Sequence, residues 1–113
     1  TAYFANRSYL TANAGTVQRF TNAIARAQRW VAEHTDREVA EAICGQVPDT
    51  DLAGLERVCA RHREIDAWNL TPVMEQAALE RLETVMTTAG QLKQEEWVDF
   101  DRLVDNSFAQ KAS

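Results

Sequence analysis

Apolar residues recur at intervals of three and four over most of this chain, which is the spacing of one face of a helix. The clearest series runs through residues 16–34, and later segments repeat the spacing between turn residues such as Pro48. The pattern predicts helices at residues about 16–34, 36–45, 50–63, 72–89 and 97–109.

Local signals mark the ends of several of these helices. Thr16 is placed to cap the first helix. Thr35 and Glu38 stand at the spacing of a capping box, in which each residue bonds the backbone N–H of the other. The Thr71–Pro72 pair would open the fourth helix, since proline is tolerated at a first helical position. Gly90 would end it in a left-handed conformation.

The first five residues follow a different pattern. Residues 1–5 combine β-branched, aromatic and small side chains and precede a polar stretch, as expected of one short strand. A lone strand leaves both of its edges unpaired and cannot form a sheet. We therefore expect a mainly α chain of one N-terminal strand and about five helices, which forms one unit of a larger α/β fold.

Composition and charge exclude some classes of function. The 113 residues are 45% hydrophobic and 26% charged, as in an ordinary soluble globular unit. Twelve Lys and Arg residues face seventeen Asp and Glu, and the basic residues are scattered, which argues against nucleic-acid binding. No apolar run approaches the roughly 20 residues that cross a bilayer, so no direct membrane insertion is expected.

No motif of catalysis or cofactor binding stands out. The sequence has nothing resembling a phosphate loop, a nucleophile elbow or a metal set. His34 and His62 fall at predicted helix C-termini, where an imidazole N–H suits the exposed carbonyls, and we interpret both as capping groups. The acidic residues between Glu95 and Asp101 are interpreted as a solvated connector. We expect no enzyme, no catalytic residue, no metal and no cofactor.

Cys44 and Cys59 lie on neighbouring predicted helices and allow two interpretations. A disulfide between them would stabilise the fold by about 3 kcal/mol through loop closure. The alternative is two small buried thiols that face one core. The spacing lacks C-x-x-C, so a zinc site is not expected.

The order of segments resembles one known family. The stretch YFANRSYL at residues 3–10, the helix ending AQRWVAEH at residue 34 and the segment DREVAEAI at residues 36–43 follow each other as in ABC-importer solute-binding proteins. The resemblance is to the nitrate, sulfonate, taurine or thiamin-pyrimidine type. The stretch DRLVDNSFA at residues 101–109 is also similar to that family, whereas Gly15 and the two cysteines depart from its pattern.

The resemblance implies a fold and candidate ligand contacts. Members are two-lobed α/β proteins of the periplasmic-binding type II-like class, and this chain would be about the last third of one. The strand at residues 1–5 would then return to the first lobe near the hinge, with most of the ligand cleft in a preceding N-terminal part. Tyr3 and Asn6, on or just after that strand, are the ligand-facing candidates.

The resemblance also implies a function. The chain would be part of the substrate-binding component of an ABC importer, which captures a small solute such as a sulfonate, taurine, nitrate or a pyrimidine-like ring. The solute would pass to a membrane permease. The parent protein would carry an export signal peptide and be periplasmic or extracellular and lipid-anchored. The alternative is a free-standing small helical protein-interaction domain.

Overall fold

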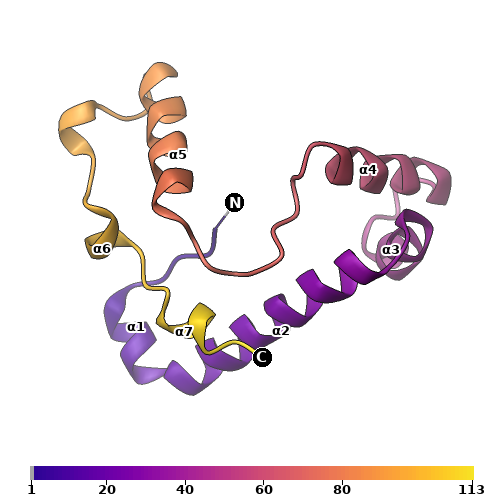
Figure 1. The fold of residues 1–113 in the computed structure, drawn as a ribbon, viewed down its shortest axis with the longest axis horizontal. Helices are drawn as coiled ribbons and strands as arrows, with labels where there is room; N and C mark the ends of the chain where they lie inside the picture. Colours follow the sequence, from indigo (N-terminus) through magenta and orange to yellow (C-terminus); the bar gives the residue numbers. More distant parts are fainter. Residues whose placement is uncertain (1) are drawn as a thin grey trace.

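The computed structural model describes residues 2–113, and within them every regular element is a helix (Figure 1). The prediction of a mainly α chain is confirmed. The elements are α1 (Arg7–Ala12), α2 (Ala14–Glu33), α3 (Asp36–Ile43), the 3₁₀ turn η1 (Cys44–Gln46), α4 (Leu52–Glu64), α5 (Gln76–Thr88), the 3₁₀ turn η2 (Gln94–Glu96), α6 (Phe100–Leu103) and α7 (Ser107–Gln110).

The strand predicted at residues 1–5 is wrong over residues 2–5, which run as coil into α1, and Thr1 lies outside the described residues. A strand needs a neighbouring strand to bond with, and residues 2–113 supply none. Asn6 begins a helix instead, because its side-chain oxygen accepts a hydrogen bond from the Tyr9 backbone N–H at 2.8 Å. The short helix α1 was not predicted, and Thr16 lies inside α2 instead of capping it.

The helix expected over residues 72–89 begins only at Gln76. The reason is a contact from far along the chain: the Met74 backbone donates to Asn106 Oδ1 at 3.0 Å and accepts from Asn106 Nδ2 at 2.9 Å. This pairing satisfies both backbone groups of Met74 without a helix. The predicted start of this helix at Pro72 is therefore wrong.

The single helix expected over residues 97–109 is replaced by α6 and α7. The Val104 backbone N–H closes the last turn of α6 on Phe100 at 2.8 Å, after which the backbone is extended. Asp105 then accepts a hydrogen bond from the Ser107 backbone N–H at 2.9 Å, which favours a turn over a continuous helix.

The buried core lies between α3 and α4. Val39, Ala40, Leu55 and Cys59 are buried there. Val31, Val47, Leu52 and Trp68 pack around them, partly exposed. The capping box predicted at the head of α3 is confirmed: Thr35 accepts from the Glu38 backbone, and Glu38 accepts from the Thr35 backbone. This box and the short connection to α2 fix where α3 turns away from α2.

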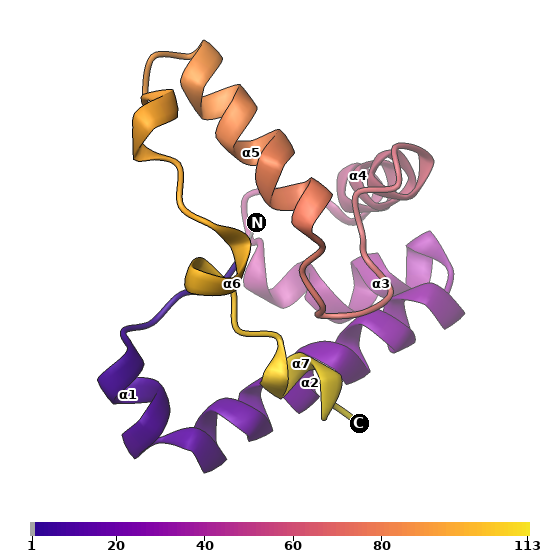
Figure 2. The same cartoon turned by 60° about the vertical axis from the view of Figure 1, so that its left-hand side comes forward.

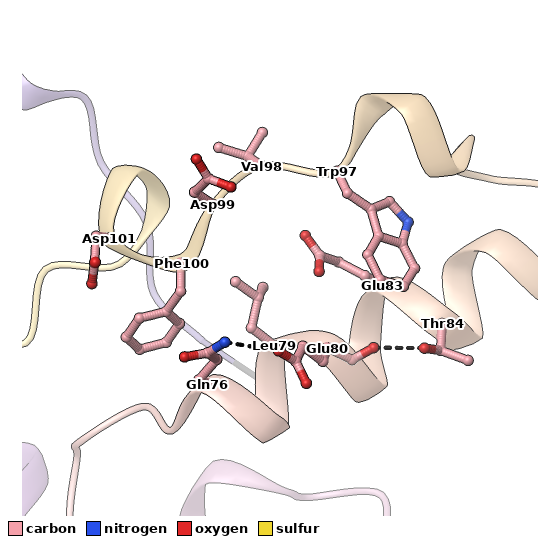
Figure 3. Close-up of a pocket in the computed structure, with 10 residues that line it drawn as sticks. All are labelled: Gln76, Leu79, Glu80, Glu83, Thr84, Trp97, Val98, Asp99, Phe100 and Asp101. Carbon is pink, nitrogen blue, oxygen red and sulfur yellow. Dashed lines mark hydrogen bonds between the residues drawn. The ribbon is translucent and has the colours of Figure 1, made fainter.

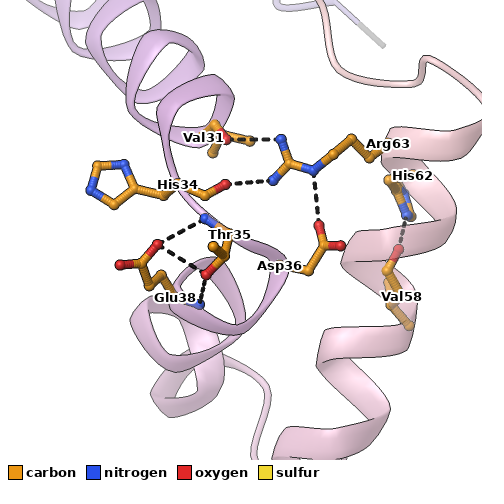
Figure 4. Close-up of polar contacts among 8 residues, drawn as sticks. All are labelled: Val31, His34, Thr35, Asp36, Glu38, Val58, His62 and Arg63. Atoms are coloured by element: carbon orange, nitrogen blue, oxygen red, sulfur yellow. Dashed lines mark hydrogen bonds and ion pairs between the residues drawn. The ribbon is translucent and has the colours of Figure 1, made fainter.

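Arg63 ties the end of α2 to α4 (Figure 4). Its guanidinium donates to the backbone oxygens of Val31 at 3.1 Å and His34 at 2.9 Å, and to the Asp36 carboxylate at 2.9 Å. The carbonyls at a helix C-terminus have no partner inside the helix, so an arginine there is favourable. His34 and His62 each bond a carbonyl one turn back, at 2.6 and 2.9 Å, as expected of capping groups.

Two helices end in the same left-handed turn. Gly90 has φ 72°, and the Gln91 backbone N–H reaches the Met86 oxygen at 2.8 Å, which confirms the predicted stop. Asp66 has φ 53° after α4, where the Ala67 backbone N–H reaches the His62 oxygen at 2.8 Å. The glycine turn sends the chain back along α5, and this return creates the hollow described below.

The molecule is open. Helix α2 runs along its base (Figure 2). The α3–α4 pair lies at one end, and α5 with the returning segment stands apart from that pair (Figure 1). The radius of gyration is 16.7 Å, against about 13 Å for a compact domain of this length. The accessible surface is 8640 Å², against roughly 6200 Å² for a compact monomer of 12.7 kDa. Much apolar surface is therefore uncovered by the chain's own residues.

Candidate functional site

A hollow with a volume of about 480 Å³ lies between α5 and the segment that returns from Gly90 (Figure 3). We call it the acidic hollow. Its lining residues are Gln76, Leu79, Glu80, Glu83, Thr84, Trp97, Val98, Asp99, Phe100 and Asp101.

Helix spacing places one wall of the acidic hollow. Gln76, Leu79, Glu80 and Glu83 stand at intervals of three and four on α5, so they share one face. The Gln76 amide donates to the Glu80 carboxylate at 2.9 Å, which holds the first of these acids in place. The wall thus combines an apolar leucine with carboxylates.

A hydrogen bond fixes the opposite wall. The Trp97 ring N–H donates to the Thr87 hydroxyl of α5 at 2.9 Å, across the turn at Gly90. Because this nitrogen is the only polar atom of an indole, its bond satisfies the ring and sets how the ring stands against α5. Val98, Asp99 and Phe100 follow directly and complete the wall.

Glu83 is the unusual member of the acidic hollow. The residue is 7% exposed, and within residues 2–113 its carboxylate has no hydrogen bond or ion pair, although its oxygens remain accessible to solvent. Figure 3 shows the carboxylate pointing into the hollow, between Leu79 and the Trp97 ring. The geometry therefore leaves Glu83 available to a partner that enters the hollow.

The charge of the acidic hollow has one sign. Four carboxylates line it, from Glu80, Glu83, Asp99 and Asp101, and none of its lining residues is Lys, Arg or His. The potential inside is negative and is concentrated by the low-dielectric walls. Anions are disfavoured there.

A second hollow of about 250 Å³ lies between α2 and the segment after α4. Arg63 lines it, but its donors are already engaged by Val31, His34 and Asp36, and its guanidinium lies 5.5 Å from the Trp68 ring centroid. The Gln28 amide donates to the Thr71 oxygen at 3.1 Å, and its own oxygen is buried without a partner. The contacts of Arg63 beside this hollow join α4 to the end of α2 and the start of α3.

Comparison with known proteins gives one relative. The whole chain is 30% identical over 113 residues to the putative binding protein YtlA of Bacillus subtilis (strain 168). The chain spans 33% of the length of that relative. No protein family and no solved structure matches the chain. The relative's name refers to binding and specifies no ligand.

The membership predicted from the resemblance to importer solute-binding proteins is contradicted. That membership required the first residues to be a strand of an α/β lobe, whereas residues 2–113 form helices and coil alone. The relative is described only as a binding protein. Amphipathic helices with similar endings occur in many proteins, and their order was not sufficient to identify this fold.

The predicted ligand contacts lie outside the acidic hollow. Tyr3 is 74% exposed, and its ring meets Phe20 of α2 edge-on with centroids 4.8 Å apart. Asn6 caps α1, where its side chain accepts from Tyr9 and from the Ser8 hydroxyl. Neither residue lines either hollow, and their role in ligand binding stays a prediction.

The two cysteines are free thiols. Cys59 is 1% exposed inside the α3–α4 core, and its burial raises the pKa of the thiol. Cys44 is exposed at the end of α3 and donates to the Glu41 oxygen at 3.2 Å. The candidate disulfide is thus not formed in this structure, and only one of the two thiols belongs to the core.

Sequence reasoning missed Glu83 and assigned Asp99 and Asp101 to a solvated connector. One signal could have indicated the site: Leu79 and Glu83 are one turn apart on the same face of α5. An acid on a face that also carries a buried leucine is unusual.

None of the helices in the described part is long and apolar enough to cross a membrane.

Proposed function

We propose that this chain is part of a binding protein that captures a small solute and does not transform it. The observation that carries the proposal is Glu83, a largely buried side chain whose accessible carboxylate points into a hollow of about 480 Å³ and has no partner within residues 2–113. A hollow of this volume is within the usual range of small-molecule sites. The name of the relative, a putative binding protein, supports a binding role.

The lining of the acidic hollow favours capture over catalysis. It offers carboxylates and apolar or aromatic surfaces, and none of its lining residues is Ser, Cys, His or Lys, the side chains that most often act as nucleophiles. The one lining hydroxyl, on Thr84, donates to the Glu80 backbone oxygen at 2.8 Å. The chemistry of these groups suits recognition.

We extend this proposal from solute binding to solute transport. The captured solute would be delivered to the permease of an ABC importer, and the protein would work in the periplasm or anchored by lipid outside the cell. The support for this step is the binding role alone. An uptake assay in cells that lack the gene tests it, with loss of uptake of the bound solute as the expected result.

The binding proposal is tested by titration calorimetry of the full-length protein against a panel of cationic, neutral and anionic small solutes. We expect at least one solute to bind, and Glu83→Gln to weaken its affinity by about tenfold or more. Glu95→Gln is the matched control, because Glu95 is exposed and outside the hollow. Absence of binding across the whole panel would refute capture of a small solute.

A second candidate is a helical protein-interaction module. The excess of about 2400 Å² of surface over a compact monomer favours it, since uncovered apolar surface marks protein contacts. Leu82 and Val85 of α5 and Leu103 of α6 are among the exposed apolar side chains. Light scattering coupled to size-exclusion chromatography tests this candidate. Association that is unaffected by Glu83→Gln would favour it over solute capture.

A further inference from the structure

We propose that the acidic hollow takes a small organic cation, namely the alkylammonium head of an amine or quaternary ammonium compound. The proposal rests on the proposed function, because it names the class of solute that the same site would capture. It extends that function, since the relative's name gives no ligand and the resemblance predicted mainly anionic solutes or flat rings.

The first argument is the distribution of charge. Glu80 and Glu83 line the hollow from α5, and Asp99 and Asp101 line it from the returning segment. The Glu83 carboxylate points into the hollow (Figure 3). No lining residue carries a positive charge that would neutralise them. The attraction between a cation and these acids is stronger inside the hollow than in water.

The second argument is the state of Glu83. A carboxylate at the end of a largely buried side chain can be reached only from the hollow that its oxygens face. Glu83 is 7% exposed and has no hydrogen bond or ion pair within residues 2–113. By contrast, Glu80 beside it is exposed and already accepts the Gln76 amide at 2.9 Å. A guest cation would supply a partner to the accessible oxygens of Glu83.

The third argument is the aromatic surface. Trp97 and Phe100 line the hollow, and the hydrogen bond from Trp97 to Thr87 engages the edge of the indole at its nitrogen. A cation over an indole face is attracted by the negative charge of the π system, and quaternary ammonium groups are recognised in this way. Leu79 and Val98 add apolar contacts for the methylene or methyl groups of the guest.

The fourth argument separates an organic cation from a metal ion. A calcium or magnesium ion needs several oxygen ligands close around one point. In the part of the chain that the structure describes, no three His, Cys, Asp or Glu side chains are grouped closely enough to hold a metal ion. Carboxylates spread around a hollow of about 480 Å³ suit a larger guest with diffuse charge.

The experiment is titration calorimetry of the full-length protein with choline, ethanolamine and putrescine. The comparison probes are 3,3-dimethylbutanol, which is the neutral isostere of choline, and taurine, nitrate, an alkanesulfonate and calcium chloride. We expect at least one amine to bind about tenfold or more tightly than the neutral isostere, with affinity falling as salt is added. Glu83→Gln should remove most of that preference, and Glu95→Gln should leave it unchanged.

The outcomes separate the two proposals. Binding of taurine, nitrate or the alkanesulfonate without binding of any amine overturns the cation site and leaves solute capture standing. Equal affinity for choline and its neutral isostere also overturns it, as does calcium binding without amine binding. Trp97→Leu, compared with Trp68→Leu outside the hollow, gives a second test that leaves Glu83 intact. An unchanged choline affinity in Trp97→Leu would contradict the role of the indole.

Discussion

At the scale of single residues, Asp66 carries a backbone conformation that favours glycine. Its φ of 53° lies in the left-handed region, where a side chain with a Cβ is strained. It also places a negative charge just after the C-terminus of α4, next to carbonyls that favour a positive one. The residue therefore stabilises neither the turn nor the helix end through its own chemistry.

We expect Asp66→Gly to stabilise the chain by about 0.5–1 kcal/mol, because glycine relieves the strain while losing more freedom on folding. Urea unfolding followed by circular dichroism measures the change. Asp66→Asn is the matched control, since it removes the charge and keeps the Cβ. A gain in the asparagine variant equal to that of glycine would mean that charge, and not backbone strain, is responsible.

Residue-level signals were readable from the sequence where partners are near in the chain. The capping box of Thr35 and Glu38 and the stop at Gly90 were both predicted, because each depends on residues within one turn. The burial of Glu83 was not predicted. It depends on Trp97 returning to α5 and bonding Thr87, and no local pattern encodes that contact.

At the scale of elements, the head of α3 depends on one charged group. The Thr35 backbone N–H and then its hydroxyl donate to the Glu38 carboxylate, at 2.8 and 2.9 Å, and these bonds lower the pKa of Glu38 below its ordinary value of 4.5. A carboxylate whose folded-state pKa is lowered stabilises the fold above its unfolded-state pKa. That contribution is lost as pH falls through the folded-state pKa.

We therefore expect the chain to lose stability on acidification below about pH 4.5, and Glu38→Gln to lose less over the same interval. Glutamine keeps a cap acceptor without a titrating charge. Thermal unfolding of the wild-type chain and the Glu38→Gln variant between pH 6 and about pH 3 measures how the stability of each depends on pH. Hydrogen bonds from Ser107 also lower the pKa of Asp105, so Asp105 loses its stabilising effect on acidification as Glu38 does. The Glu38→Gln variant should therefore keep part of the dependence of stability on pH. Identical slopes in the two proteins would contradict a role for the box.

Elements were predicted well where the apolar spacing is long and regular. Helix α2 and the α3–α4 pair lie close to the predicted ranges, because their faces pack within a short stretch of chain. The strand at residues 1–5 failed, since composition alone does not supply a neighbouring strand. The start of α5 depends on Asn106, which lies 32 residues from Met74 in sequence. A contact between residues so far apart in the sequence produces no regular spacing of apolar residues from which it could be predicted.

At the scale of the whole molecule, the described residues form an open arrangement around α2. Side-chain contacts join its parts at a few points. Arg7 donates to the Arg102 oxygen at 2.7 Å, and Gln18 donates to the Phe108 oxygen at 2.9 Å. Each holds the C-terminal segments against the α1–α2 end of the molecule. The core between α3 and α4 lies at the other end (Figure 1).

We expect dilute monomeric chain to show a radius of gyration near 16.7 Å, well above the about 13 Å of a compact domain. Small-angle X-ray scattering after size-exclusion chromatography measures it, with the mass from light scattering as the control for association. A value near the compact one at monomer mass would contradict the open arrangement.

The acidic hollow is formed by α5 and the segment that follows it, and no other part of the described chain contributes a lining residue. Every residue that lines the acidic hollow falls between Gln76 and Asp101, one uninterrupted stretch of chain. Most pockets are assembled from distant stretches and are lost when any of them is rearranged. This one lies in one continuous segment, so insertions before Met74 or after Asn106 would leave both its lining residues and the pairing that sets the start of α5 unchanged.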